Sequence, residues 1–274
     1  MKFSLIIATL GREKELYDLF ESLDKQTYKN FEVIVIDQNK DDRVFKCVQK
    51  YMKILDIKYK KSLIRGGSYN RNIGIKLVEG DVVTFTDDDC TYNRELLENL
   101  VSDFNRFHDF NIMCYEIVDK NNNKKLADFP DKITDINTKN IFKCAMNTST
   151  FIKYKNINDL NFDEKLGVGA EFGSCEDSDL IYRLLNNTYK LKFIPKELIY
   201  HPCKEYPPYV GYTYGLGLGA FVKKTIKKYH KGDMIFFYIK EVIKAFLGIF
   251  IRPKRRAYYW NTLKGRIVGF IKYK

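Results

Sequence analysis

A short apolar run that ends in three consecutive carboxylates constrains this chain most. Residues 82–86 are Val-Val-Thr-Phe-Thr, enough for a buried strand, and Asp87, Asp88 and Asp89 follow at once. Three adjacent acids repel one another, so a core strand gains no stability from ending in them. A bound Mg²⁺ or Mn²⁺ would turn that repulsion into coordination, because both ions take hard oxygen ligands. The alternative is a solvated acidic turn.

Length and composition indicate a globular protein of a reducing compartment. The chain has 274 residues, with 45% hydrophobic and 30% charged residues, which is ample for a large α/β core. Its six cysteines lie far apart without a C-x-x-C pair, which argues against a zinc ribbon and a disulfide framework. The apolar N-terminus, residues 1–9, is too short for a signal peptide, so we interpret it as the first strand of a cytosolic protein.

The positive charge is concentrated in the last quarter of the chain. The net charge is +12, and residues 201–274 contain 16 Lys and Arg against three Asp and Glu. The first 200 residues are therefore nearly neutral. A nucleic-acid enzyme would carry basic charge across its catalytic body, whereas a basic tail on a neutral body favours docking to an anionic surface.

The first ninety residues show the pattern of a parallel sheet. Residues 3–9 and 31–37 are apolar strand runs, and residues 13–25 between them have helical spacing. Strand, helix and strand at this spacing form a βαβ unit, and ligands of such sheets gather at the carboxyl ends of the strands. Thr9, Asp37 and the three aspartates all stand at such ends.

A glycine-rich junction lies just before the acidic run. Residues 65–76 place two glycines ahead of a predicted helix that Ser68 or Asn70 could cap. Arg71 in the start of this helix indicates a phosphate site. A plain loop-to-helix junction explains the glycines equally well, but not the clustering of arginine and asparagines.

Four of these segments together resemble the family 2 glycosyltransferases, GT-A enzymes that use nucleotide-activated sugars. The segments are residues 4–9, 32–37, 70–74 and 80–89, and the likeness extends over about residues 3–200. It is to the bacterial capsule, exopolysaccharide and O-antigen transferases. The resemblance implies an α/β chain with the GT-A fold, a Rossmann-like, mixed and mainly parallel sheet flanked by helices, followed by a C-terminal helical basic tail.

By position, the resemblance assigns the first two strand ends to the donor. Thr9 and Asp37 would flank the uracil or an equivalent base, with Arg12 nearby, and Arg71 would help hold the nucleotide and the acidic cluster. The family often has Asp-Asp-Gly-Ser after its second strand, where this chain has residues 37–40 as Asp-Gln-Asn-Lys. The first acid is kept, so the resemblance implies that recognition of the nucleotide base is kept as well.

The resemblance also divides the work within the acidic run. Asp89 would bind the metal, Mn²⁺ or Mg²⁺, while Asp87 and Asp88 would hold the ribose or the donor sugar. A leaving nucleoside diphosphate carries charge that a metal and arginine neutralise. His201, after a predicted strand over residues 191–200, is a further candidate ligand because imidazole suits Mn²⁺. A lone histidine in such a place is more often structural.

A second acidic group follows a glycine-rich loop, which we expect to be mobile. Glu176, Asp177 and Asp179 open a predicted helix over residues 180–185. Acids at a helix start often act only as caps. The resemblance implies instead that Asp177 is the catalytic base of inverting transfer and Glu176 a substrate-binding or orienting group, with Asp179 the less favoured base. A base must reach the acceptor hydroxyl.

We place the end of the catalytic domain near residue 207, at the rigid Tyr-Pro-Pro-Tyr segment 206–209. Residues 1–90 would be its nucleotide-binding half and residues 91–207 its acceptor and base half. Within the second half the pattern predicts strands over residues 112–118 and 141–151. Residues 208–274 would form an amphipathic, basic helical region.

The predicted tail has the features of an interfacial membrane anchor. Residues 234–251 are mostly apolar, but Lys240, Glu241 and Lys244 interrupt them, so a spanning helix is not expected. Cations and aromatic residues surround this segment, including Lys231 and Trp260. The alternative is a helical subdomain that packs on the core or on a second subunit. The glycine-rich residues 212–221 would line the acceptor path or form a helix-packing seam.

The sequence thus predicts a metal-dependent, inverting glycosyltransferase that moves one hexosyl or N-acetylhexosaminyl unit from a nucleotide sugar, such as a UDP-sugar. The acceptor would be a lipid-linked glycan or an oligosaccharide in bacterial surface polysaccharide synthesis. We expect a cytoplasmic protein, peripheral at the inner face of the membrane, without a nucleic-acid partner; its oligomeric state stays open. A processive synthase would show Gln-x-x-Arg-Trp, but Trp260 follows two tyrosines. The alternatives are a sugar nucleotidyltransferase, which the short turn at residues 10–12 disfavours, and an inactive scaffold, which the intact acids disfavour.

Overall fold

The computed structural model describes residues 1–230 and 232–274, which form two compact units. The first unit comprises residues 1–65, 69–161 and 180–203, and the second comprises residues 66–68, 162–179 and 204–274. Lys231, part of the predicted basic tail, lies outside the described residues. The segment predicted to carry the catalytic base therefore belongs to the same unit as the C-terminal helices.

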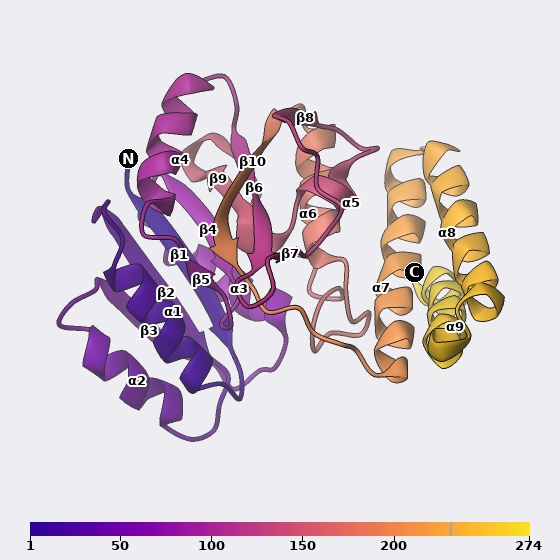
Figure 1. Cartoon of the computed structure of the whole chain (residues 1–274), viewed down its shortest axis with the longest axis horizontal. Helices are drawn as coiled ribbons and strands as arrows, with labels where there is room; N and C mark the ends of the chain where they lie inside the picture. The colour runs from indigo at the N-terminus through magenta and orange to yellow at the C-terminus, as the bar shows by residue number, and fades with distance from the viewer. Residues whose placement is uncertain (231) are drawn as a thin grey trace. The chain divides into compact units, whose positions relative to one another are not determined.

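The first unit contains a mixed sheet in the order β3-β2-β1-β4-β9-β6-β10-β5, with β7 beside β6 and β8 beside β10 (Figure 1). Its strands are β1 (Phe3–Thr9), β2 (Phe31–Asp37), β3 (Ile57–Lys61), β4 (Val82–Thr86), β5 (Thr91–Tyr92), β6 (Ile112–Asp119), β7 (Lys124–Lys125), β8 (Thr134–Ile136), β9 (Thr150–Lys153) and β10 (Leu191–Tyr200). The expected α/β class and mixed sheet are confirmed, and the longest pairings are parallel.

The parallel strands bring the predicted donor residues to one edge of the sheet. β1 pairs with β2 so that Thr9 lies opposite Asp37, and β4 pairs with the other side of β1. All seven residues of β2 are buried, as expected for a strand covered by helices on both faces. The polar residues that follow these strands therefore share one edge.

Helices cover the sheet. They are α1 (Lys14–Asp24), α2 (Arg43–Tyr51), α3 (Gly67–Ile75), α4 (Leu96–Arg106), α5 (Ile141–Cys144) and α6 (Glu176–Asn186), with 3₁₀ turns η1 (Asn147–Ser149) and η2 (Tyr154–Asn156). α1 buries Leu16, Leu19, Phe20 and Leu23, the apolar spacing that predicts it. The helices and strands place the nucleotide-site candidates on a packed scaffold.

One predicted strand is wrong. Residues 141–151 were expected to be extended, but the chain forms α5, then η1, and only Thr150 onward joins β9. Thr150 Oγ1 donates to the Met146 carbonyl at 2.7 Å, and the Ser149 amide bonds the same carbonyl at 3.1 Å. Such local bonds from hydroxyl residues compete with a sheet ladder and favour a turn.

The second unit contains the three C-terminal helices α7 (Pro208–Tyr229), α8 (Gly232–Ile251) and α9 (Arg256–Lys272), with the turn η3 (Pro253–Arg255) before the last. Figure 1 shows α7 beside α9. No helix in residues 1–230 and 232–274 is both long enough and apolar enough to cross a bilayer.

A glycine seam joins α7 to α9. Gly211, Gly215 and Gly219 recur every four residues on α7, and a Cβ at Gly215 would lie 2.4 Å from the Thr262 carbonyl oxygen. On α9, a Cβ at Gly265 would lie 2.2 Å from the Tyr212 carbonyl oxygen. Small residues at this spacing let two helix backbones touch. The structure thus assigns residues 212–221 to a packing seam, one of the two alternatives that the sequence leaves open.

Candidate active site

In the first unit, the acidic run meets the loop that follows β1. Thr9 Oγ1 donates a hydrogen bond of 2.7 Å to Asp88 Oδ2. Arg12 places Nε 2.9 Å from Asp88 Oδ1 and Nη1 2.8 Å from Asp89 Oδ2. Burial raises the pKa of Asp88 to about 6 despite Thr9 and Arg12, and the two neighbouring carboxylates add to the rise. The cluster is therefore a strained concentration of negative charge that favours cations.

Arg71 approaches the same run from α3. Its Nη2 lies 3.1 Å from Asp87 Oδ1, and its side chain is 10% exposed against 36% for Asp87. The loop after β1, the helix α3 and the segment after β4 thus bring two arginines to three aspartates. Guanidinium groups in such a place bind the oxygens of a diphosphate as well as those of carboxylates.

His201 stands directly after β10 and faces Asp89. Its Nε2 lies 3.3 Å from Asp89 Oδ1, and both side chains are largely buried. His201 Nδ1 lies 2.9 Å from the Pro202 carbonyl oxygen, which can only accept a hydrogen bond. Nδ1 therefore acts as the donor to that carbonyl, and Nε2 is the nitrogen that faces the carboxylate, where it would donate a hydrogen bond when the ring is protonated or bind a metal ion through its lone pair. Metal-binding histidines have this arrangement, with the far nitrogen held by a carbonyl.

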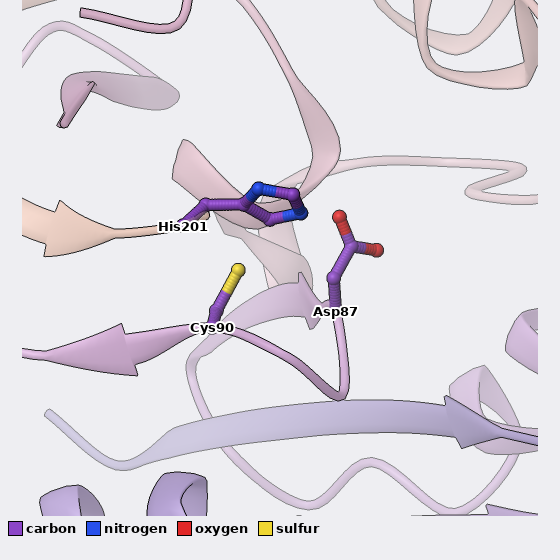
Figure 2. Close-up of side chains that lie close together, drawn as sticks. All are labelled: Asp87, Cys90 and His201. Carbon is purple, nitrogen blue, oxygen red and sulfur yellow. The ribbon is translucent and has the colours of Figure 1, made fainter. Parts of the chain in front are cut away.

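Asp87, Cys90 and His201 also bring their ligand atoms within 4.8 Å of one another (Figure 2). Cys90 is an unsuitable ligand for a hard ion. Burial raises the pKa of its thiol well above the ordinary value, and its Sγ accepts a hydrogen bond of 3.1 Å from Thr148 Oγ1. A carboxylate and an imidazole suit Mn²⁺ or Mg²⁺, so Asp87 and His201 of this group could hold the ion, and Asp89 Oδ1 lies 3.3 Å from the same imidazole. Asp87 is the addition to the predicted ligands.

Asp37 is fully buried at the end of β2. Its Oδ1 accepts hydrogen bonds of 2.8 Å from the backbone and side-chain nitrogens of Asn39, while Oδ2 accepts one of 2.7 Å from Tyr59 and lies 3.1 Å from Lys61 Nζ. The carboxylate thus holds the loop after β2 in place, where the nucleotide base is predicted to bind. Its contact with a base stays a prediction.

Asn39 is a residue of this site that the sequence reasoning missed. Its Oδ1 accepts a 2.8 Å hydrogen bond from the Gly11 amide, which ties the loop after β2 to the loop that carries Arg12. Gly11 has φ of +79°, a conformation that favours glycine. The departure from the family's Asp-Asp-Gly-Ser was the signal, because an asparagine beside the kept acid can bridge two loops.

In the second unit, Glu176 and Asp177 begin α6 as predicted. Cys175 before them has φ of +67°, which is uncommon for a residue with a Cβ. Glu176 is 8% exposed, whereas Asp177 is half-buried and its Oδ1 accepts a 2.7 Å bond from the Ser178 amide. Asp177 is therefore the more accessible of the two carboxylates.

Asp179 is held by an ion pair. It is 2% exposed, and its Oδ1 lies 2.7 Å from Lys224 Nζ on α7. The same Nζ lies 2.7 Å from Asp163 Oδ2, which also accepts a 3.0 Å hydrogen bond from Tyr273. Asp179 is thus held by Lys224 in this unit, and the choice of Asp177 as the catalytic base stays a prediction.

The glycines in the loop before the predicted catalytic base are required by the backbone conformation or by close packing. Gly167 and Gly169 have φ of +102° and +82°. A Cβ at Gly173 would lie 2.1 Å from Thr213 Cγ2, and one on Gly217 of α7 would lie 2.2 Å from Ser174 Oγ. The loop is therefore packed directly on α7 within the second unit.

Comparison with known proteins gives the family and the fold. The family model described as "Glycosyl transferase family 2" matches residues 4–166. The poly(ribitol-phosphate) beta-N-acetylglucosaminyltransferase TarS of Staphylococcus aureus is 34% identical over 112 residues, which cover 39% of this chain and 20% of TarS. The Campylobacter jejuni GalNAc(5)-diNAcBac-PP-undecaprenol beta-1,3-glucosyltransferase is 36% identical over 91 residues, 32% of this chain and 29% of that protein.

Comparison with solved structures supports the same fold. TarS residues 1–349 in complex with UDP-GlcNAc superimpose with a TM-score of 0.65 at 22% identity, covering 82% of this chain and 67% of that one. The Pyrobaculum calidifontis mannosyltransferase PcManGT, in complex with GDP-Man and Mn²⁺, gives 0.64 at 14% identity, covering 95% and 73%. The expected GT-A fold is confirmed.

The chain spans 20% and 29% of the length of the two curated relatives named above. Their whole activities, substrates and partners are therefore not transferred to it. The family match itself covers more than half of the chain and includes the strands that carry Thr9, Asp37 and the three aspartates. The chain belongs to glycosyl transferase family 2.

Proposed function

We propose that this protein is an inverting, metal-dependent glycosyltransferase that moves one sugar from a nucleotide-sugar donor to a hydroxyl group of a glycan acceptor. The observation that carries the proposal is the cluster of Asp87, Asp88 and Asp89 with Arg12 and Arg71 at one sheet edge. Such a cluster suits a ligand that contains both a divalent cation and a diphosphate.

The donor half would use residues of the first unit. Thr9 and Asp37 would flank the base, and Asp87 and Asp88 would hold the ribose or sugar. Arg12 and Arg71 already pair with carboxylates and would turn to the diphosphate oxygens when a metal neutralises those carboxylates. A UDP-sugar is the favoured donor, and the UDP-GlcNAc complex of TarS supports a hexosyl or N-acetylhexosaminyl unit.

Asp89 and His201, with Asp87, would hold Mn²⁺ or Mg²⁺. When bound, the ion supplies positive charge beside the departing diphosphate. The Pro202 carbonyl oxygen keeps the His201 ring in the tautomer that presents Nε2. The side chains of Asp89 and His201 are 4% and 14% exposed, so they would hold their positions without a large rearrangement.

Asp177 would be the catalytic base. It accepts the proton of the acceptor hydroxyl as that oxygen forms a bond to the anomeric carbon. The bond from the anomeric carbon to the phosphate oxygen breaks, and its electron pair leaves with the nucleoside diphosphate. Glu176 would orient the acceptor, and Asp179 would stay paired with Lys224. A single displacement of this kind inverts the anomeric configuration.

The acceptor is proposed to be a lipid-linked glycan of a bacterial surface polysaccharide, a capsule for example, and the enzyme a cytoplasmic protein at the inner face of the membrane. The name of the Campylobacter jejuni relative, with its undecaprenol diphosphate, supports a lipid-linked acceptor. An oligosaccharide acceptor is the other possibility within the same reaction. The oligomeric state is left to measurement.

Calorimetric titration tests the donor half directly. UDP should bind the full chain in the presence of Mn²⁺ and bind at least tenfold more weakly with EDTA. Asp89→Asn should lose the dependence on metal, while Asp109→Asn, an exposed surface carboxylate, should bind like the wild type. Equal affinity for UDP with and without metal would contradict the proposed site. Pyrophosphate release from a nucleoside triphosphate and a sugar phosphate would indicate a nucleotidyltransferase instead.

A further inference from the structure

The outward face of α8 is apolar along its whole length. Six of its side chains recur at helical spacing and are between 47% and 77% exposed. They are Phe236, Ile239, Ile243, Phe246, Leu247 and Phe250, here called the α8 face. A contiguous exposed apolar stripe of this size marks an interaction surface rather than scattered surface residues.

The side of α8 opposite the α8 face packs on other helices of the second unit. The helix is therefore already docked in its own unit, and the α8 face is a separate, exposed surface. Tyr238 stacks on Phe270 of α9 with ring centroids 4.6 Å apart, and its hydroxyl donates a 3.0 Å hydrogen bond to the Arg266 carbonyl oxygen. A Cβ at Gly248 would lie 2.4 Å from the Tyr259 ring. These contacts fix which face of α8 points outward.

Cations border the α8 face at both ends and along one side. Lys227 and Lys228 precede α8, and Lys240 lies on its exposed surface. Exposed Arg252, Lys254, Arg255 and Arg256 follow its last turn. The acid Glu241 on α8 is engaged by Arg266 at 2.8 Å and Lys244 at 3.5 Å. Asp233 in the first turn of α8 is an exposed acid, but the cations named above outnumber it, so the border is positive.

An aromatic residue of the interfacial type lies on the next helix. Trp260 of α9 is 49% exposed, with Lys264 Nζ 5.1 Å from its ring centroid. Tryptophan and lysine together suit the boundary between lipid headgroups and acyl chains. A helix with an apolar face, a basic border and such neighbours has the composition of a helix that lies in a membrane interface.

We propose that the α8 face docks onto an anionic phospholipid bilayer, with α8 in the plane of the interface. Charge distinguishes this occupant from a second copy of the chain. A twofold contact through the α8 face would set the same basic border against itself, and like charges would oppose it. An anionic headgroup layer complements the same border.

The role of docking rests on the proposed function, because it would hold the enzyme at the surface where a lipid-linked acceptor resides. Docking itself needs neither donor nor acceptor. Vesicle binding without nucleotide and UDP binding without vesicles are therefore separate measurements, and either can fail without the other.

Vesicle flotation of the full chain tests the proposal. The wild type should float with phosphatidylcholine vesicles that contain phosphatidylglycerol, and much less with phosphatidylcholine alone or in about 0.5 M salt. Replacing Phe246 and Phe250 by Gln should weaken the partition about tenfold per residue. Arg255→Glu with Arg256→Glu should remove the preference for anionic vesicles.

Leu63→Gln provides the matched control, because this apolar side chain of the first unit is 85% exposed and should not affect flotation. Circular dichroism and UDP binding should be the same in all variants. The proposal is overturned if the wild type does not float, or if the phenylalanine variant floats like the wild type. It is also overturned if light scattering finds a dimer that this variant dissociates, since the α8 face would then join two copies.

Discussion

Replacing Lys224 by methionine removes a cation that joins Asp163 and Asp179 in the second unit. The lysine Nζ lies 2.7 Å from a carboxylate oxygen of each aspartate. The side chains of Lys224 and Asp163 are each 17% exposed, and that of Asp179 is 3% exposed. Burial opposes the ionisation of Asp163, yet hydrogen bonds led by Lys224 hold its pKa below the ordinary value. Without Lys224, the buried Asp179 and the partly buried Asp163 would lie close together without this cation.

The expected cost follows from this geometry. Removing one partner of a buried ion pair costs about 3–5 kcal/mol, because an uncompensated charge remains in the interior. The partial exposure of Lys224 and Asp163 screens part of this, so we expect a loss of about 3 kcal/mol in the free energy of unfolding. Because Asp179 lies two residues after Asp177, the turn of α6 that carries the proposed base should shift as well.

Urea unfolding and steady-state kinetics measure both effects. Lys224→Met should lower the turnover rate about tenfold to a hundredfold with little change in donor affinity, since a displaced base affects the chemical step. Lys227→Met, an exposed position on the same helix, should lie within about 0.5 kcal/mol of the wild type. A triple variant that also carries Asp163→Asn and Asp179→Asn should recover much of the stability. A Lys224→Met protein as stable as the Lys227→Met control would refute the reasoning.

Three further predictions concern the seam, an acid in the sheet and the loop bridge. Gly215→Ala should cost at least about 2 kcal/mol in thermal unfolding, because a methyl group would meet the Thr262 carbonyl 2.4 Å away and neither backbone can yield. Glu32→Gln should cost about 2 kcal/mol at pH 7, allowing for solvent screening, because hydrogen bonds led by Lys58 and Ser4 outweigh burial and lower the Glu32 pKa to about 2. Asn39→Ala should weaken UDP binding about tenfold by releasing Gly11 and the loop of Arg12.

Each of these has its control. Gly232→Ala should be nearly neutral, because no atom of the described residues other than its chain neighbours lies within 4 Å of the added Cβ. Equal losses at Gly215 and Gly232 would contradict the seam. The Glu32 contribution is present above the unfolded pKa near 4.5 and is lost as the pH falls through about 2, so wild type and Glu32→Gln should converge there. A constant gap down to pH 2 would refute that assignment. Gln38→Ala, which leaves Asn39 in place, should affect UDP binding less than Asn39→Ala does.

The parallel half of the sheet could be read from the sequence almost residue by residue. Residues 3–9 and 31–37 are continuous apolar runs bounded by turn residues, and the structure has β1 and β2 over the same bounds. Strands buried on both faces leave this signal because nearly every position is apolar, and the buried Glu32 of β2 is paired with Lys58 at 2.7 Å. The polar residues that end these strands, Thr9 and Asp37, lie opposite each other at one edge of the sheet, as predicted.

Long-range partners could not be predicted in this way. Lys224 reads as one of several lysines on a basic helix, and only the fold brings it to Asp163 and Asp179. The same holds for His201, whose 3.3 Å approach to Asp89 depends on how β10 lies in the sheet. Pairings between residues that lie far apart in the sequence carry no local signature.

The mixed region between β6 and α6 was the least predictable. Residues 141–151 contain apolar and hydroxyl residues that fit either an amphipathic strand or a turn. Local bonds to the Met146 carbonyl decide for a turn, and β9 begins only at Thr150. Whether this segment forms a strand or a turn depends on local hydrogen bonds, which secondary-structure propensities do not predict.

Release of nucleoside diphosphate by the wild type and Asp177→Asn, with a UDP-sugar, Mn²⁺ and a lipid-linked glycan extract, tests the central claim most directly. The account predicts release that needs metal and acceptor, and a fall of at least about a hundredfold in Asp177→Asn with UDP binding preserved. Undiminished release in Asp177→Asn, or equal release in EDTA, would contradict it.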